Sequence, residues 1–244
     1  MVYRFREPAD PGRPPPAGGG RVPDAPAMTA AGAGYARFAA LWDRCVAAPP
    51  SPPAGAVYAE LARLLDGPDR RFHNSSHIAD CLARFDEVTA LLHDRDAVEM
   101  GIWFHDAIYV PGDPANERRS AQLFLRRSEG ARPLFRRRVC ALIMTTKRAV
   151  AARGNDRKFI DDIDLAGFGA SWEEFMRHGD LLREEFAAQS DPEYYRGLAA
   201  FLAVLRGRPH FFGTDYYRTR YEPKARDNLD RLRASLAERG YGGG

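Results

Sequence analysis

The chain of 244 residues has few cysteines and no long apolar run. Cys45, Cys81 and Cys140 are odd in number and far apart, which excludes a disulfide framework and a Cys-x-x-Cys zinc site, so we expect three small core residues. No stretch approaches the roughly 18 apolar residues of a membrane span, and the mean hydropathy of -0.45 agrees. The sequence therefore predicts a soluble protein without membrane spans.

A large net charge is absent as well. The formal charge of +3 at pH 7 is too small to indicate specific nucleic-acid binding. The arginines are nevertheless unevenly distributed, and a crowded stretch forms either a solvated helix face or a rim that attracts a phosphorylated ligand. This stretch contains Arg118, Arg119, Arg126, Arg127, Arg132, Arg136, Arg137 and Arg138.

The N-terminal segment lacks the apolar stretch of a secretory signal. Its acidic residues Glu7, Asp10 and Asp24 argue against a transit peptide, so a cytoplasmic location is expected. Residues 1 to about 30 hold seven of the 18 prolines, and such a segment cannot bury enough apolar surface to offset its ordering entropy. We therefore expect a disordered tail over residues 1–30, with Met28 as an alternative start, followed by one domain over residues 31–244.

From Tyr35 onward the apolar residues recur at steps of three and four, which is typical of amphipathic helices. We find no convincing run of alternating residues that would indicate strands. The predicted fold class is all-α, with helices near residues 35–45, 55–65, 75–92, 96–106, 116–128, 133–146, 157–165, 172–188, 192–205 and 223–237.

Three of these predicted helices carry side chains that ligate metals. His105 and Asp106 are consecutive at the end of an apolar segment, His77 lies at the start of another helix, and residues 159–165 include three aspartates. Adjacent residues on a helix diverge by about 100°, so the His-Asp pair can flank an ion only if other helices complete the shell. A mixed set of nitrogen and oxygen ligands suits Mn, Fe, Co, Ni or Zn and tolerates Mg.

These segments resemble the HD superfamily of metal-dependent phosphohydrolases. More narrowly, they are similar to a group of bacterial HD-type predicted phosphohydrolases without a settled substrate. The matching motifs lie at residues 70–78, 102–109, 116–121 and 162–165, and residues 183–186 and 225–229 are also similar. The resemblance covers roughly residues 35 to 237 and implies a helical bundle of the HD type.

The resemblance also implies a metal site and a reaction. It assigns the metal ligands to His77, His105, Asp106 and Asp164, with Asp161 and Asp162 as competitors for the last role. The ion would activate a water for hydrolysis of a small phosphorylated substrate, with nucleotides as the first class to consider. HD proteins that hold two metals carry extra histidines between the His-Asp pair and the final Asp, and this chain has none there, so one divalent ion per chain is expected.

Further residues are candidates for roles around the ion. Glu117 is either a first-turn acid stabilised by the helix dipole or the group that manages the proton in hydrolysis. Arg70, Lys147 and Arg148 are candidate contacts for the substrate phosphate, although long cations also commonly lie at the surface. His73 is either a helix-entry residue bonded to the backbone or a ligand of the phosphate.

Other functions stay open on the sequence alone. An HD-fold regulatory module would bind a phosphorylated ligand without turning it over, and an HD-fold di-iron oxygenase would need histidines for a second metal. A helical interaction protein would bind no metal at all. The sequence indicates neither a base-specific contact nor an oligomeric state.

Overall fold

A computed structural model describes residues 27–46, 49, 51–148 and 151–241. Within these residues the chain forms ten α-helices and two short 3-10 turns and contains no strand, which confirms the all-α prediction. The helices are α1 (Ala27–Val46), α2 (Ala54–Leu65), α3 (Ser75–Val88), α4 (Arg95–Phe104), α5 (Asn116–Arg127), α6 (Pro133–Ile143), α7 (Asn155–Leu165), α8 (Trp172–Glu185), α9 (Asp191–Arg206) and α10 (Asp215–Glu238), and the 3-10 turns are η1 (Thr89–Leu91) and η2 (Ala166–Gly169).

Helix α1 begins at Ala27, inside the range predicted to be a tail, and residues 1–26 lie outside the described residues. No helix in the described part of the chain combines the length and the apolar character that crossing a membrane requires.

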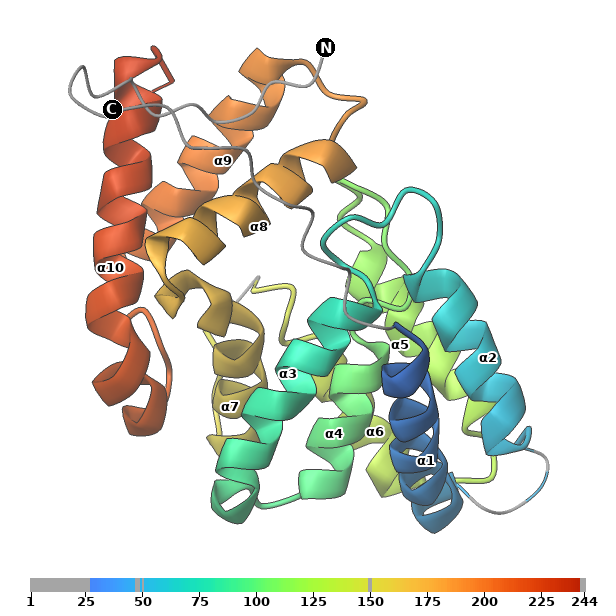
Figure 1. Ribbon diagram of the computed structural model, residues 1–244. Coiled ribbons are helices and arrows are strands. Elements are labelled where there is room, and N and C mark those ends of the chain that lie inside the picture. The colour runs from blue at the N-terminus through green and yellow to red at the C-terminus, as the bar shows by residue number, and fades with distance from the viewer. Residues whose placement is uncertain (1–26, 47–48, 50, 149–150, 242–244) are drawn as a thin grey trace.

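Helices α3, α4 and α7 pack against one another in the middle of the molecule. Helices α1 and α2 cover one side of this group, and α8, α9 and α10 lie on the other side (Figure 1). Helices α5 and α6 pack on α4. The three segments that carry the sequence-predicted metal ligands are therefore neighbours in space.

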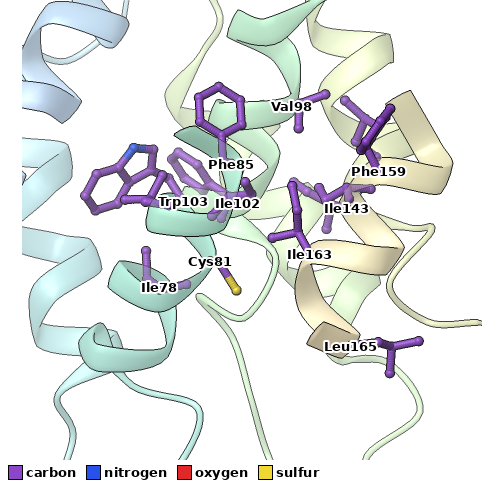
Figure 2. Packing of buried hydrophobic residues seen from close by; sticks show 14 of the residues in the cluster. Ile78, Cys81, Phe85, Val98, Ile102, Trp103, Ile143, Phe159, Ile163 and Leu165 are labelled. Atoms are coloured by element: carbon purple, nitrogen blue, oxygen red, sulfur yellow. The ribbon is translucent and has the colours of Figure 1, made fainter. Parts of the chain in front are cut away.

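Apolar side chains at helical spacing hold the central helices together. On α3, Ile78, Cys81 and Phe85 are buried, and they meet Ile102 of α4 and Ile163 of α7 in one continuous core (Figure 2). Helix α4 is buried along almost its whole length. Removing each such side chain from water contributes about 1.5–3 kcal/mol, so these contacts fix how the helices approach one another.

Several helix boundaries differ from the sequence prediction, and two of these differences are described here. Helix α10 begins at Asp215 rather than Pro223, because Thr214 caps it by accepting a hydrogen bond from the Tyr217 N–H, and Pro223 lies inside the helix. Helix α4 ends at Phe104, so His105 is its C-terminal cap and Asp106 lies in the following turn. The second difference shapes the candidate site.

Candidate metal centre

The N-terminus of α3 positions His77. Asn74 caps the helix, and its side-chain oxygen accepts hydrogen bonds from the backbone N–H groups of Ser76 and His77. The cap satisfies backbone donors that a helix N-terminus otherwise leaves unpaired, and it fixes the first turn of the helix. The buried His77 ring therefore projects from a rigid start of α3 toward α4 and α7.

The turn after α4 positions His105 and Asp106. Nδ1 of His105 lies 2.9 Å from the carbonyl oxygen of Ile102, which can only accept, so Nδ1 carries the proton and Nε2 faces the centre. Asp106 follows in the turn after the helix, and its Oδ2 lies 3.0 Å from Nε2 of His105. The same oxygen lies 3.5 Å from Nε2 of His77.

The last turn of α7 brings Asp164 to the two imidazoles. Its Oδ1 lies 3.1 Å from Nε2 of His77 and 3.5 Å from Nε2 of His105, and the two imidazole nitrogens are 3.3 Å apart. The structure thus brings together all four residues to which the resemblance assigns ligand roles. Three of them, His77, His105 and Asp164, join Cys81 in a cluster whose donor atoms lie within 4.8 Å of one another.

The other two aspartates of α7 have different surroundings. Asp162 is fully buried, and its carboxylate accepts hydrogen bonds from the backbone N–H groups of Gly213 and Thr214 and from the Thr214 hydroxyl. Asp161 pairs with Arg148 at 3.0 Å. Asp162 therefore anchors the segment before α10, and only Asp164 of the three contacts the histidines in the structure.

The pKa values in the centre shift in opposite directions. Burial lowers the pKa of both histidines, but neighbouring groups outweigh it. Cys81 and Asp164 raise the pKa of His77 well above its usual value, and Asp106 and Asp164 raise that of His105. Burial favours a raised pKa for the two carboxyls. The neighbouring His105 nevertheless holds the pKa of Asp106 below its usual range, and Arg148 holds the pKa of Asp164 below its usual range. The carboxylates are therefore anionic, and a bound cation would displace protons from the imidazoles.

Arg148 occupies the side of Asp164 that faces away from the histidines. Its guanidinium forms a short ion pair with Oδ2 of Asp164. Burial lowers the pKa of this guanidinium, but the nearby carboxylates of Asp164 and Asp161 outweigh burial and raise the pKa above its usual value. Arg148 also has a positive φ of 56°, in the left-handed region that non-glycine residues seldom adopt. The sequence-based candidate for a phosphate contact is thus engaged with Asp161 and Asp164, and it orients the Asp164 carboxylate.

A second polar group lies beside the centre around His73. Its Nδ1 is 2.6 Å from Oε2 of Glu185, while Oε1 of Glu185 accepts the backbone N–H groups of residues 71–73. Burial favours a raised pKa for Glu185, but the hydrogen bond from His73 and the backbone donors outweigh burial and lower the pKa. The ring of His73 stacks on Tyr109 at 4.0 Å between centroids. Sequence reasoning noted Glu185 only as part of a similar motif and missed this pairing, because 112 residues separate the two.

Arg70 joins the segment before α3 to the turn after α4. Its guanidinium donates hydrogen bonds to the carbonyl oxygens of His73, Asp106 and Ala107 at 2.8, 2.9 and 3.1 Å. One side chain therefore fixes the segment before α3 relative to the turn after α4. Its predicted contact with a substrate phosphate stays a prediction.

Glu117 and Lys147 form no hydrogen bond or ion pair with the four candidate ligands within the part of the chain that the structure describes. Glu117 is half-buried in the first turn of α5 and makes no hydrogen bond or ion pair with any residue that the structure describes. Lys147 is exposed, and its ammonium donates to the carbonyl oxygen of Pro114, just before α5. Their catalytic roles stay predictions.

The start of α5 contributes structure rather than a ligand. Asn116 is the first helical residue of α5, and its amide exchanges two hydrogen bonds with the backbone of Val110. One turn later the Ser120 hydroxyl bonds both backbone groups of Ile108. These contacts hold the turn that carries the His-Asp pair against α5.

Comparison of the chain with protein-family models, with curated proteins and with solved structures gave no match. The cluster of His77, Cys81, His105 and Asp164 is therefore identified from its own geometry as a group of side chains that can hold a metal ion.

Proposed function

We propose that this protein is a metal-dependent hydrolase of phosphate esters, with His77, His105, Asp106 and Asp164 as the ligands of one divalent ion. The observation that carries the proposal is the convergence of these four side chains from three segments of the chain. The closest separations of their donor atoms are 3.0, 3.1 and 3.3 Å. Ligand atoms about 2.0–2.2 Å from one ion lie about 2.9–3.6 Å apart, so the residues fit a divalent metal.

A divalent ion in such a site supplies a Lewis acid, which lowers the pKa of water to about 7 and withdraws charge from a phosphoryl oxygen. The mixture of imidazole and carboxylate suits Mn, Fe, Co, Ni or Zn and tolerates Mg. The resemblance of the motifs to HD phosphohydrolases supports a phosphate ester as the substrate, and it favours a nucleotide or a related small metabolite.

The residues around the ligands would bind and orient that substrate. His73 is held at Nδ1 by Glu185, and its Nε2 makes no hydrogen bond within the described residues. When the ring is protonated at both nitrogens, Nε2 can donate to a phosphoryl oxygen or pass its proton to the leaving group. Lys147 is exposed near the start of α5 and would attract the anionic substrate. Arg70 would hold the segment before α3 and the turn after α4 in fixed positions relative to each other.

The experiment that tests the proposal is a screen of phosphorylated metabolites against the purified full chain. The protein is supplied in turn with Mn, Co, Ni, Fe, Mg and Zn, and released phosphate is measured. We expect hydrolysis of at least one compound with a metal and none after chelation. Binding of a phosphorylated compound without turnover under every metal would replace the hydrolase by a regulatory module.

Two variants then separate the candidate proton carriers. His73→Gln or Glu117→Gln should slow turnover by roughly 10²- to 10⁴-fold if that residue moves the proton, while metal content stays unchanged. The exposed Glu129→Gln is the matched control and should behave as the unaltered protein. The variant that keeps the full rate identifies the residue without that role.

A further inference from the structure

Tyr109 follows Asp106 by three residues, and its phenol ring is held by two neighbours. The ring of His73 stacks on it, with 4.0 Å between the centroids and 26° between the planes. The guanidinium carbon of Arg70 lies over the ring at 5.3 Å from its centroid. Both neighbours are themselves fixed, because Arg70 donates to three backbone carbonyl oxygens and His73 pairs with Glu185. The position of the Tyr109 ring is therefore well defined.

The hydroxyl of Tyr109 makes no hydrogen bond with any residue that the structure describes. The side chain is only partly exposed, and phenol hydroxyls in such positions ordinarily find a partner. Burial raises the pKa of the phenol above its usual value, and the nearby carboxylates of Glu185 and Asp106 raise it further. The hydroxyl therefore stays protonated, and it can donate to a bound ligand.

The stacked partner of Tyr109 reaches the proposed metal ligands. The rings of His73 and His77 lie 5.8 Å apart between centroids, in an edge-to-face arrangement. Two donors without a partner in the described residues, the Tyr109 hydroxyl and Nε2 of the doubly protonated His73 ring, therefore belong to neighbouring rings beside the centre. A phosphoryl group bound there would meet both.

The ordinary alternative is that Tyr109 only fills the space between the segment before α3 and the turn after α4. A phenylalanine would fill it equally well, and leaving a partly buried hydroxyl unpaired is unfavourable. Tyr217 of α10 is a case without a ligand nearby, because its hydroxyl is buried and unpaired while its ring stacks on Tyr221. What distinguishes Tyr109 is its stacking on His73 and the effect of Asp106 on its phenol.

We propose that the Tyr109 hydroxyl contacts the substrate and donates a hydrogen bond to an oxygen of its phosphoryl group. The metal ion, the His73 imidazole and the Tyr109 phenol would then each address one oxygen, and a terminal phosphoryl group offers three. A diester offers only two such oxygens, so the substrate class is a phosphate monoester. The inference deepens the proposed function and rests on its metal centre, but it does not require turnover.

Binding of inorganic phosphate to the manganese-loaded full chain tests this inference. Manganese is paramagnetic and broadens the phosphorus resonance of phosphate bound close to it, so a titration followed by phosphorus NMR gives a dissociation constant for the centre. We expect Tyr109→Phe to weaken phosphate binding by about 10- to 100-fold, the range of one hydrogen bond to a charged group, because it keeps the stacked ring and removes only the hydroxyl. Tyr217→Phe is the matched control and should bind phosphate as the unaltered protein does, and both variants should keep the metal.

Phosphate binding by Tyr109→Phe that is as tight as in the unaltered protein would overturn the contact and leave the metal centre standing. Loss of manganese or of cooperative unfolding in Tyr109→Phe would assign the hydroxyl a structural role and would also overturn the contact. An unaltered chain that binds manganese but no phosphate overturns the inference alone, and one that binds no manganese overturns the metal centre with it. The expected weakening in a chain that hydrolyses no phosphate monoester would support the inference and reject the hydrolase.

Discussion

At the scale of single residues, the centre is a balance of buried charges. Asp106, Asp161 and Asp164 lie close together, and Arg148 is the cation that pairs with two of them. A buried carboxylate without a partner is costly, so Arg148 compensates for charge that a bound cation would otherwise offset. Arg148 is thus a structural counterion of the centre.

Arg148→Ala should destabilise the metal-free protein by up to about 3–5 kcal/mol, because it removes the closest cation of two mostly buried carboxylates. Asp161 keeps Arg208 at 3.8 Å, and Asp164 keeps its contacts with the two histidines. Saturation with metal should recover part of this loss, because the ion binds the folded state and offsets the same charge. Chemical denaturation with and without metal measures both effects. Arg138→Ala, which breaks the more exposed ion pair with Asp94, is the control and should cost about 1 kcal/mol or less. Equal losses in the two variants would contradict the role of Arg148.

Glu185 adds a pH dependence to stability. Its folded-state pKa is lowered, so its contribution is fully present above the usual pKa of the carboxyl and is lost as pH falls through the folded value. Glu185→Gln should therefore be less stable than the unaltered protein at pH 7, and the difference should shrink on acidification below about pH 4.5. Denaturant melts from pH 3 to 7 measure this, and a difference that stays constant with pH would exclude the ionised carboxylate as its cause.

At the scale of elements, α10 holds the end of α7 in place. The turn η2 begins directly after α7, two residues after Asp164, and packs against α10. The side-chain amide of Asn228 donates to the carbonyl oxygens of Phe168 and Ala170. Gly169 allows this approach, because a Cβ there would lie 2.8 Å from Cβ of Tyr221 and 3.1 Å from its carbonyl oxygen. The lack of a side chain at one residue therefore sets the distance between two elements.

Gly169→Ala should destabilise the protein by about 1–3 kcal/mol, because part of the contact is with backbone that cannot move alone. Gly197→Ala in α9 meets no atom within 4 Å and is the matched control. This control should be neutral or more stable by up to about 1 kcal/mol, since alanine favours helix over glycine. Thermal unfolding compares the two, and a neutral Gly169→Ala would show that η2 and α10 are not in tight contact.

Most of the helices could be predicted from the local sequence, because an amphipathic helix shows apolar residues at steps of three and four within its own segment. The exceptions have local causes: the cap at Thr214 starts α10 before Pro223, and the chain leaves α4 one residue before His105. Sequence reasoning placed both His105 and Asp106 on the helix and could not foresee the turn.

At the scale of the whole molecule, the centre exists because three segments converge. The resemblance named His77, His105, Asp106 and Asp164, yet the approach of Arg148 and the pairing of His73 with Glu185 depend on packing between distant segments. No spacing in the sequence encodes such contacts. Cys81 is buried in the hydrophobic core, as the sequence predicts.

The metal content of the purified chain tests the central claim most directly. Protein saturated with zinc or cobalt and then desalted should retain close to one equivalent per chain by elemental analysis. His105→Ala should lose most of it, because it removes a proposed ligand, while the exposed His93→Ala keeps it and both variants retain a cooperative unfolding transition. A full equivalent retained by His105→Ala, no metal in the unaltered chain, or two equivalents per chain would contradict the single centre described here.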